Sequence, residues 1–220
     1  MPSKARNTLA ANEDDFDRLW GLHEKEAGTT PGRKYNVDVL NRAAVVMVCA
    51  AWEAYCEDIV AEAIAIIAAD CKDPASLPSC LKTHVGKRIK TSSHDHAAWD
   101  MAGDGWRAVV TSNASDAVKK LTGSWNTPKT SQVNDLFNVS LGIIDISAKW
   151  KWAKNPAATT GKKLDAFVTL RGEIAHRLKT ADSVHKKDGT DFYDFVCRVA
   201  DIIDTEVHAV VVAATAKNYW

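Results

Sequence analysis

Two side chains that could handle an anion stand within the stretch Arg171-Gly172-Glu173-Ile174-Ala175-His176. A helical spacing of about 100° per residue groups Arg171 with five apolar side chains: Leu164, Phe167, Leu170, Ile174 and Leu178. Because a guanidinium stays charged in any protein environment, an arginine that faces a core or an interface needs a carboxylate or a phosphate beside it. The stretch therefore predicts a site where Arg171 meets an anionic group.

The spacing of Arg171 and His176 limits how the two can act together. Five residues along one straight helix turn the side chain by about 140°, so one helix cannot direct both groups at the same atom. The pair needs a partner helix, a distorted turn or a second subunit. A purely structural interpretation stays open, with Arg171 in a salt bridge to a core-facing glutamate and His176 exposed on the opposite face.

The element that must position Arg171 is predicted from the longest helical pattern, at residues 36–70. Apolar residues recur there at steps of three and four, and residues 43–52 are apolar on every side, which is typical of a helix covered by neighbours all round. Glu53 ends this uncharged run, and Glu57 follows one turn later. The central helix thus carries the carboxylates best placed to meet Arg171, with Glu53 as the candidate supporting residue.

A second candidate site interleaves lysines and tryptophans. Lys149, Trp150, Lys151 and Trp152 could bind RNA, because indoles stack on unpaired bases while lysines hold phosphates. The alternative, which we favour, is a tryptophan anchor in the core whose neighbouring lysines extend to the solvent.

Metal and nucleotide motifs are weak in this chain. His94-Asp95-His96 could contribute metal ligands, but the sequence offers no matching third or fourth ligand. Gly161-Lys162 does not make a phosphate-binding loop, because Pro156 stands where the motif needs glycine and Lys163 where it needs serine or threonine. We therefore expect neither a metal ion nor a cofactor.

The composition restricts the class of protein. With 220 residues, 46% of them hydrophobic, the chain can build a sizeable core, and its formal net charge of zero means that any nucleic-acid surface must be a local patch. Five cysteines form no CxxC pair, which favours free thiols. The longest uncharged apolar run is about half a membrane span. We expect a soluble, cytoplasmic protein without a membrane partner.

The fold predicted from these patterns is all-α, an antiparallel helical bundle around one long central helix. Residues 1–35 are expected to form an N-terminal helix, at residues 12–27, and a linker, followed by a helical domain at residues 36–220. Further helices are predicted at residues 103–123 and 160–179. Another helix should follow a turn at residues 124–128, with Thr127 as its cap and Pro128 as its first residue. The last helix should follow a hydrophilic turn at residues 186–189. Only residues 143–146 suggest a short strand.

The arrangement of these motifs resembles the HEPN superfamily. Arg171 and His176 fit its R-x4-6-H signature, in the penultimate long helix of an all-helical domain. The stretches at residues 51–55 (Ala-Trp-Glu-Ala-Tyr) and 126–128 (Asn-Thr-Pro), together with Leu170-Arg171 and Ile174-Ala175-His176, look like the RiboL-PSP branch. The resemblance covers about residues 36–215.

The resemblance implies a metal-independent endoribonuclease that acts as a homodimer, in which two Arg-His helices meet near the two-fold axis. Arg171, His176 and Glu173 would then be the catalytic residues. A neutral imidazole can take the proton from a ribose 2′-hydroxyl, and Arg171 would stabilise the charge on the phosphorane. The products would be a 2′,3′-cyclic phosphate and a 5′-hydroxyl.

The resemblance further implies RNA partners, such as tRNA or another single-stranded or looped RNA. It also implies a role as a prokaryotic toxin or antiviral defence effector, with an antitoxin or a defence-system protein as a further partner. The alternative is an inactive HEPN module that binds RNA or a protein as a dimeric scaffold. Gly172 motivates this alternative, because family members that cleave RNA usually carry a polar residue directly after the arginine.

Overall fold

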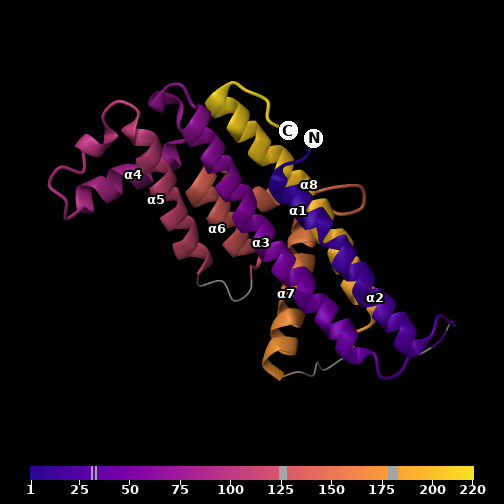
Figure 1. Cartoon of the computed structure of the whole chain (residues 1–220). Coiled ribbons are helices and arrows are strands. Elements are labelled where there is room, and N and C mark those ends of the chain that lie inside the picture. Colours follow the sequence, from indigo (N-terminus) through magenta and orange to yellow (C-terminus); the bar gives the residue numbers. More distant parts are fainter. Residues whose placement is uncertain (31, 33, 124–127, 178–182) are drawn as a thin grey trace.

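The computed structural model describes residues 1–30, 32, 34–123, 128–177 and 183–220, and it confirms the all-α fold (Figure 1). The helices in chain order are α1 (Lys4–Ala11), α2 (Glu13–Ala27), α3 (Asp38–Asp70), α4 (Ser79–Thr91), α5 (Gly105–Thr122), α6 (Thr130–Leu141), α7 (Ala157–Arg177) and α8 (Lys186–Thr215). Three short 3-10 helices lie at Pro74–Ser76, Trp99–Met101 and Ile146–Lys149. The strand suggested at residues 143–146 does not form, and over the described ranges the only bridge of strand type joins Trp152 to Asn155.

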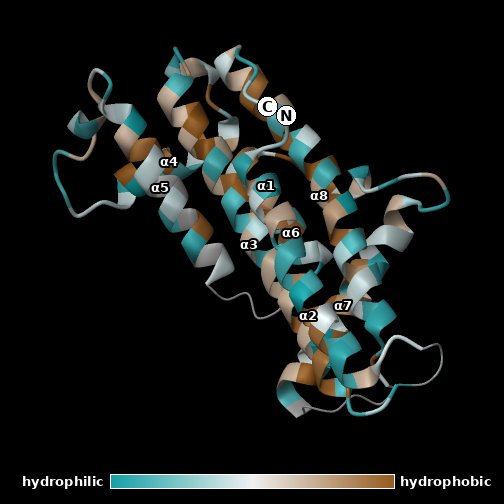
Figure 2. Cartoon of the chain, turned by 45° about the vertical axis from the view of Figure 1, so that its right-hand side comes forward, coloured by the Kyte–Doolittle hydropathy of each residue, from teal (hydrophilic) through white to brown (hydrophobic). Residues whose placement is uncertain are grey.

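The helix α3 is the centre of the molecule, as its all-round apolar sequence predicts. It packs against α8, α5, α1 and α7, so that neighbours cover it on several sides (Figures 1 and 2). Trp52, Cys56 and Ile59 are fully buried, and the Tyr55 hydroxyl donates to the carbonyl of Ala200 at 2.8 Å. A buried tyrosine usually finds such a partner. The hydrogen bond ties α3 to α8 at the middle of both helices.

Two pairs of helices lie toward opposite ends of α3 (Figure 1). The pair α4 and α5 lies toward its C-terminal end, and α2 and α7 lie toward its N-terminal end. The helix α7 packs on α3, on α6 and on the short helix at Ile146–Lys149. The candidate motif therefore belongs to a helix that packs directly against the central helix α3.

Two predicted helix starts are wrong. The helix α6 begins at Thr130, and the Gln132 side chain accepts a hydrogen bond from the Lys129 amide at 3.0 Å, so Pro128 precedes the helix instead of opening it. The predicted cap, Thr127, lies outside the described residues. The expected turn at residues 186–189 is the first turn of α8.

Gly189 explains why that first turn reads as a loop in the sequence. A Cβ at this position would lie 2.8 Å from the Cβ of Ala44 and 3.1 Å from the ring of Trp20. Real side chains do not approach so closely, so the glycine permits close packing of α8 on α3 and α2. Its role is contact between helices, which a sequence pattern cannot distinguish from a turn.

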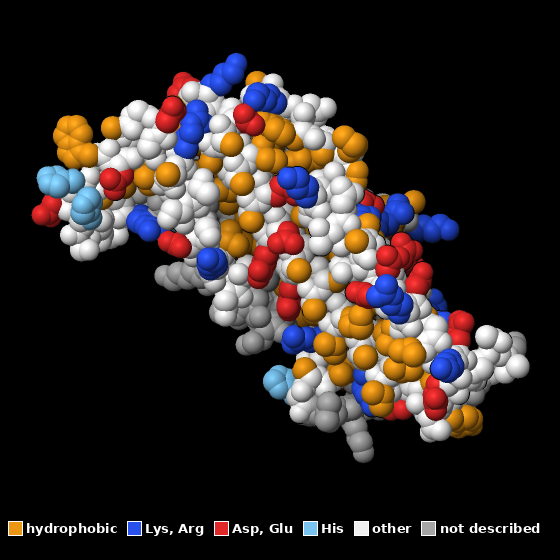
Figure 3. All heavy atoms as spheres, in the orientation of Figure 1, with side chains coloured by type: hydrophobic (Ala, Val, Ile, Leu, Met, Phe, Trp, Pro, Cys, Tyr) orange, Lys and Arg blue, Asp and Glu red, His pale blue; other side chains and the backbone are white. Residues whose placement is uncertain are grey.

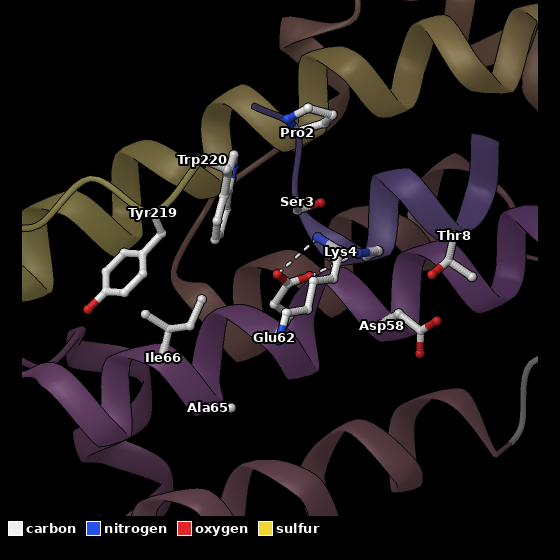
Figure 4. A pocket seen from close by; sticks show the side chains of 11 residues that line it. Pro2, Ser3, Lys4, Thr8, Asp58, Glu62, Ala65, Ile66, Tyr219 and Trp220 are labelled. Atoms are coloured by element: carbon white, nitrogen blue, oxygen red, sulfur yellow. Dashed lines mark hydrogen bonds between the residues drawn. The ribbon is translucent and has the colours of Figure 1, made fainter. Parts of the chain in front are cut away.

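The N-terminal residues pack on the central helix as a helix that the sequence did not predict. Leu9 and Ala5 of α1 are buried against α3 and α8. The Glu62 carboxylate of α3 accepts hydrogen bonds from the amides of Lys4 at 3.0 Å and Ala5 at 2.9 Å (Figure 4). These amides belong to a helix N-terminus that otherwise has no partners for them, so Glu62 caps α1 from another element.

The same region buries a carboxylate that should weaken the fold at neutral pH. Asp204 is 7% exposed, and burial raises the pKa of its carboxyl, although the Ser3 amide donates to it at 3.3 Å. A raised folded-state pKa means that the acid stabilises the fold most below its unfolded pKa and that this contribution is lost as the pH rises through the folded value.

We therefore expect Asp204→Asn to raise the free energy of unfolding at pH 7, because the amide oxygen keeps the Ser3 bond without a buried charge. The gain should vanish below the ordinary aspartate range. Urea unfolding at pH 7 and at about pH 3 would measure it. Asp201→Asn is no substitute as a control because Asp201 pairs with Arg6 at 2.6 Å, so the exposed Asp95→Asn serves instead. Equal effects at both pH values would contradict the expectation.

The five cysteines are free thiols, as predicted, and Cys49, Cys56 and Cys71 are buried. In the part of the chain that the structure describes, none of the helices combines the length and the apolar character needed to cross a membrane.

Candidate functional site

The candidate residues lie in the last two turns of α7. Arg171 is half-buried and Ile174 is 4% exposed, whereas Glu173 and His176 are exposed. Residues three apart on a helix are neighbours, so Arg171 lies beside Ile174 toward the fold and Glu173 lies beside His176 toward the solvent. One helix thus presents the arginine inward and the histidine outward.

Glu53 of α3 is the carboxylate beside Arg171. It is half-buried, and one of its carboxylate oxygens is buried with no hydrogen-bond partner among the described residues. Burial raises the pKa of the Glu53 carboxyl, the Arg171 guanidinium opposes this rise, and Glu57 adds to it. The structure therefore brings together the candidate supporting residue and the candidate catalytic arginine.

Cys49, one turn before Glu53 on α3, also feels the charge of Arg171. Burial, together with the charge of Glu53, raises the pKa of this thiol to about 12, and Arg171 opposes part of this rise. Such a thiol is uncharged at neutral pH and behaves as a small apolar side chain. Cys49 was not among the candidate residues, although its spacing of four from Glu53 places both on one face of α3.

Arg171 and His176 do not converge within one chain. Their different exposure on the same uninterrupted helix agrees with the separation of about 140° that helical geometry gives. A reacting phosphate that touches both groups would have to be reached by His176 of one helix and Arg171 of another.

Charge near the site is not uniformly positive. Figure 3 shows basic and acidic side chains mixed over one face, and acidic ones gather along the middle of α3, which carries Glu57, Asp58 and Glu62. Burial and the neighbouring Glu62 raise the pKa of Asp58. An RNA backbone would be repelled from this part of α3.

The prediction that Trp150 binds RNA is wrong. Trp150 is fully buried, and its ring meets that of Trp52 edge to face with centroids 6.3 Å apart. A base cannot stack on a ring that the core covers. Trp150 is the core anchor of the favoured alternative.

The other residues of that stretch are more accessible. Trp152 is half-buried, packs against Phe195 at 6.1 Å between centroids, and lies 5.2 Å from the Arg198 guanidinium. Lys149 and Lys151 are exposed, and Lys149 lies 3.4 Å from a Glu206 carboxylate oxygen. Of the four residues in this stretch, Lys149 and Lys151 are exposed enough to contact a phosphate.

The His94 and His96 side chains lie on an exposed connection, with ring centroids 6.1 Å apart. Over the described residues, no group of three or more His, Cys, Asp or Glu side chains is arranged to hold a metal ion.

The fold and the placement of the motif agree with a known family of proteins. The model of the RiboL-PSP-HEPN family matches residues 13–209, from α2 to near the end of α8. The chain belongs to the RiboL-PSP-HEPN family. Neither the curated proteins nor the solved structures give a significant match. Membership in this family suggests a role in cleaving or binding RNA.

Proposed function

We propose that this HEPN protein is a metal-independent endoribonuclease that acts as a homodimer. The proposal rests on the different directions of two side chains of α7. Arg171 is half-buried near Glu53, whereas His176 is exposed near the end of the same helix. A two-fold axis beside this end of α7 would let two copies supply what one helix cannot. Family membership supports RNA as the substrate.

The reaction follows from the chemistry of the two side chains. His176 as a neutral imidazole accepts the proton of a ribose 2′-hydroxyl, and the 2′-oxygen forms a bond to phosphorus. Arg171 stabilises the negative charge of the phosphorane through its planar set of donors. The bond between phosphorus and the 5′-oxygen then breaks, and that oxygen takes up a proton. The products are a 2′,3′-cyclic phosphate and a 5′-hydroxyl.

Glu53 and Glu173 have different supporting roles in this proposal. Glu53 is a positioning residue, because it lies beside Arg171 on the inner side of α7. Glu173 is exposed next to His176, where a carboxylate can orient an imidazole or a water. The exposed Lys149 and Lys151 would contact the RNA backbone.

The alternative function is an inactive dimeric scaffold that binds RNA or a protein. The electrostatic influence of Arg171 on Glu53 favours it, because a carboxylate near the guanidinium competes with a phosphate for the same charge. In either case we propose a cellular role as a prokaryotic toxin or antiviral effector, with an antitoxin or defence-system partner.

The experiment that tests the proposal compares wild-type protein with Arg171→Ala and His176→Ala on total tRNA in EDTA. Cleavage with 5′-hydroxyl and cyclic-phosphate ends should disappear in both variants, because each loses an essential group. The exposed His96→Ala and Arg18→Ala variants are matched controls and should cleave like the wild type. A DNA strand of the same sequence should stay intact because it lacks the 2′-hydroxyl.

Two outcomes would decide against the proposal. Undiminished cleavage by folded His176→Ala would remove the histidine from the chemistry. A folded wild-type dimer that binds tRNA without cutting it would favour the scaffold.

A further inference from the structure

A cavity of about 930 Å³ lies at the N-terminal end of α3, apart from the Arg171 site. Its walls come from the end of α2, the connection to α3, the first turn of α3 and the residues that lead into α8. Its volume lies at the upper end of the range of about 300–1,000 Å³ that is usual for small-molecule sites.

Two buried polar side chains line this cavity without satisfying all their hydrogen-bonding atoms. His23 and Asn41 are each 5% exposed. The Asn41 Nδ2 atom donates to the carbonyl of Val184 at 3.0 Å, which fixes the amide. The Asn41 Oδ1 and His23 Nδ1 atoms are buried and have no partner in the part of the chain that the structure describes. Such atoms are rare in folded proteins and call for a ligand or a water.

The described lining of the cavity contains two lysines, Lys34 and Lys186, together with two carboxylates. Lys34 donates to the carbonyls of Ala27 at 3.1 Å and Gly28 at 2.6 Å, contacts that leave its charge in place. Lys186 lies 3.1 Å from Glu24 and 5.2 Å from the Trp20 ring. Burial lowers the pKa of His23, and the charges of Lys186 and Lys34 lower it further, so both lysines act on the interior of the cavity.

The two longest helices, α3 and α8, both begin at the cavity, and at the start of α8 the Asp188 carboxylate already accepts from the His185 amide at 2.7 Å. A helix N-terminus favours an anion through its amides and its dipole. Of the two carboxylates among the described residues of the lining, Glu24 faces Lys186, and Asp38 pairs with Arg42 at 2.6 Å.

Tyr35 supplies an aromatic side chain at the mouth of the cavity. It is 70% exposed and belongs to the lining. An exposed ring beside lysines is the combination on which single-stranded nucleic acids and nucleotides stack.

We propose that this cavity binds one phosphorylated nucleotide. The base stacks on Tyr35 and presents its polar edge to Asn41 and His23, since the Asn41 oxygen accepts from an amino group and its second amide hydrogen can donate. The phosphate lies toward Lys34.

The ligand can be a free nucleotide or one nucleotide of an RNA strand, because the two share this chemistry. Ser183 of the lining follows His176 by seven residues, so their Cα atoms lie at most about 25 Å apart. An RNA that reaches His176 can therefore place a nearby nucleotide here. Binding of an RNA nucleotide in the cavity rests on the proposed ribonuclease function, whereas binding of a free nucleotide does not.

The test is calorimetric titration of the purified full chain with AMP, GMP, CMP and UMP, with adenosine, ribose 5-phosphate and inorganic phosphate for comparison. At least one nucleotide should bind at least about tenfold more tightly than adenosine or ribose 5-phosphate, because each fragment lacks one half of the recognition. Tyr35→Ala should weaken nucleotide binding about tenfold through the lost stacking. Trp99→Ala, which removes a 76% exposed ring elsewhere, should bind normally.

Asn41→Leu should also weaken binding, but it removes the hydrogen bond to Val184 and can therefore disturb the fold. The variant of the exposed Tyr35 is the decisive one for this reason. The proposal is overturned if no nucleotide binds more tightly than phosphate, or if Tyr35→Ala binds like Trp99→Ala. Water would then serve the buried atoms.

A competition experiment separates the two sources. It uses the His176→Ala protein with a short single-stranded RNA. Displacement of the RNA by excess nucleotide, lost in a protein that also carries Tyr35→Ala, would assign the cavity to RNA. Nucleotide binding without displacement would assign it to a free nucleotide. Neither titration involves cleavage, so failure of the ribonuclease proposal would leave both results intact.

Discussion

Mixing the Arg171→Ala protein with the His176→Ala protein is expected to restore RNA cleavage that neither variant retains alone. Loss of a general base or of a charge-stabilising donor typically slows a reaction about 10²–10⁴-fold. If Arg171 of one subunit acts with His176 of its partner, a mixed dimer carries one complete site. Random exchange should then give about one quarter of the wild-type rate, because half of the dimers are mixed and each has one site of two.

The measurement is the initial rate on tRNA after the two variants have exchanged subunits, with each variant alone at the same total concentration. Absence of any recovery, although mixed dimers are present by mass spectrometry of tagged chains, would mean that the two residues act within one subunit. Because the two side chains point about 140° apart on α7, that result would require the last turns of α7 to distort on binding RNA.

Trp150→Ala is expected to lower the free energy of unfolding by about 3–5 kcal/mol, the usual cost of removing a large buried aromatic side chain. Trp150 is fully buried and packs edge to face on Trp52 of the central helix. For a chain of this length, the melting temperature should fall by on the order of 10 °C. Thermal unfolding followed by circular dichroism would measure the shift.

Trp99→Ala is the matched control, because its ring is 76% exposed and its loss should change stability by no more than about 0.5 kcal/mol. Trp150→Phe should cost less than Trp150→Ala, since it keeps an aromatic ring and removes an indole N–H that has no acceptor among the described residues. A normal melting temperature for Trp150→Ala together with weakened RNA binding would contradict the buried position of Trp150.

The parts of the fold that sequence could predict are those set by local periodicity. The central helix was expected at residues 36–70 and found at Asp38–Asp70, because apolar residues on all sides identify a covered helix. The helix α1 was missed because its few buried residues carry little pattern, and its N-terminus is capped by Glu62 from α3. Gly189 was misread because its close packing partner, Ala44, is distant in sequence.

The candidate site also has features that local sequence could predict and features that it could not. The inward direction of Arg171 and the outward direction of His176 follow from helical geometry, and Glu53 follows from the end of the apolar run in α3. Whether Trp150 faces a base or the core depends on where its segment meets Trp52, about a hundred residues earlier, and no local rule gives that contact. The cavity around His23 and Asn41 joins two distant stretches of the chain, residues 23–41 and 183–186, and left no motif in the sequence.

The helix α3 is continuous, so it fixes the distance between the two sites that lie along it. Asn41, at the nucleotide cavity, and Glu53, beside Arg171, are twelve residues apart on this one helix, so they are separated along its axis by about 18 Å. A helix with a covered middle cannot shorten or bend without disrupting the core around it. Any two groups held at these points keep a constant spacing, whatever moves at the ends of the molecule.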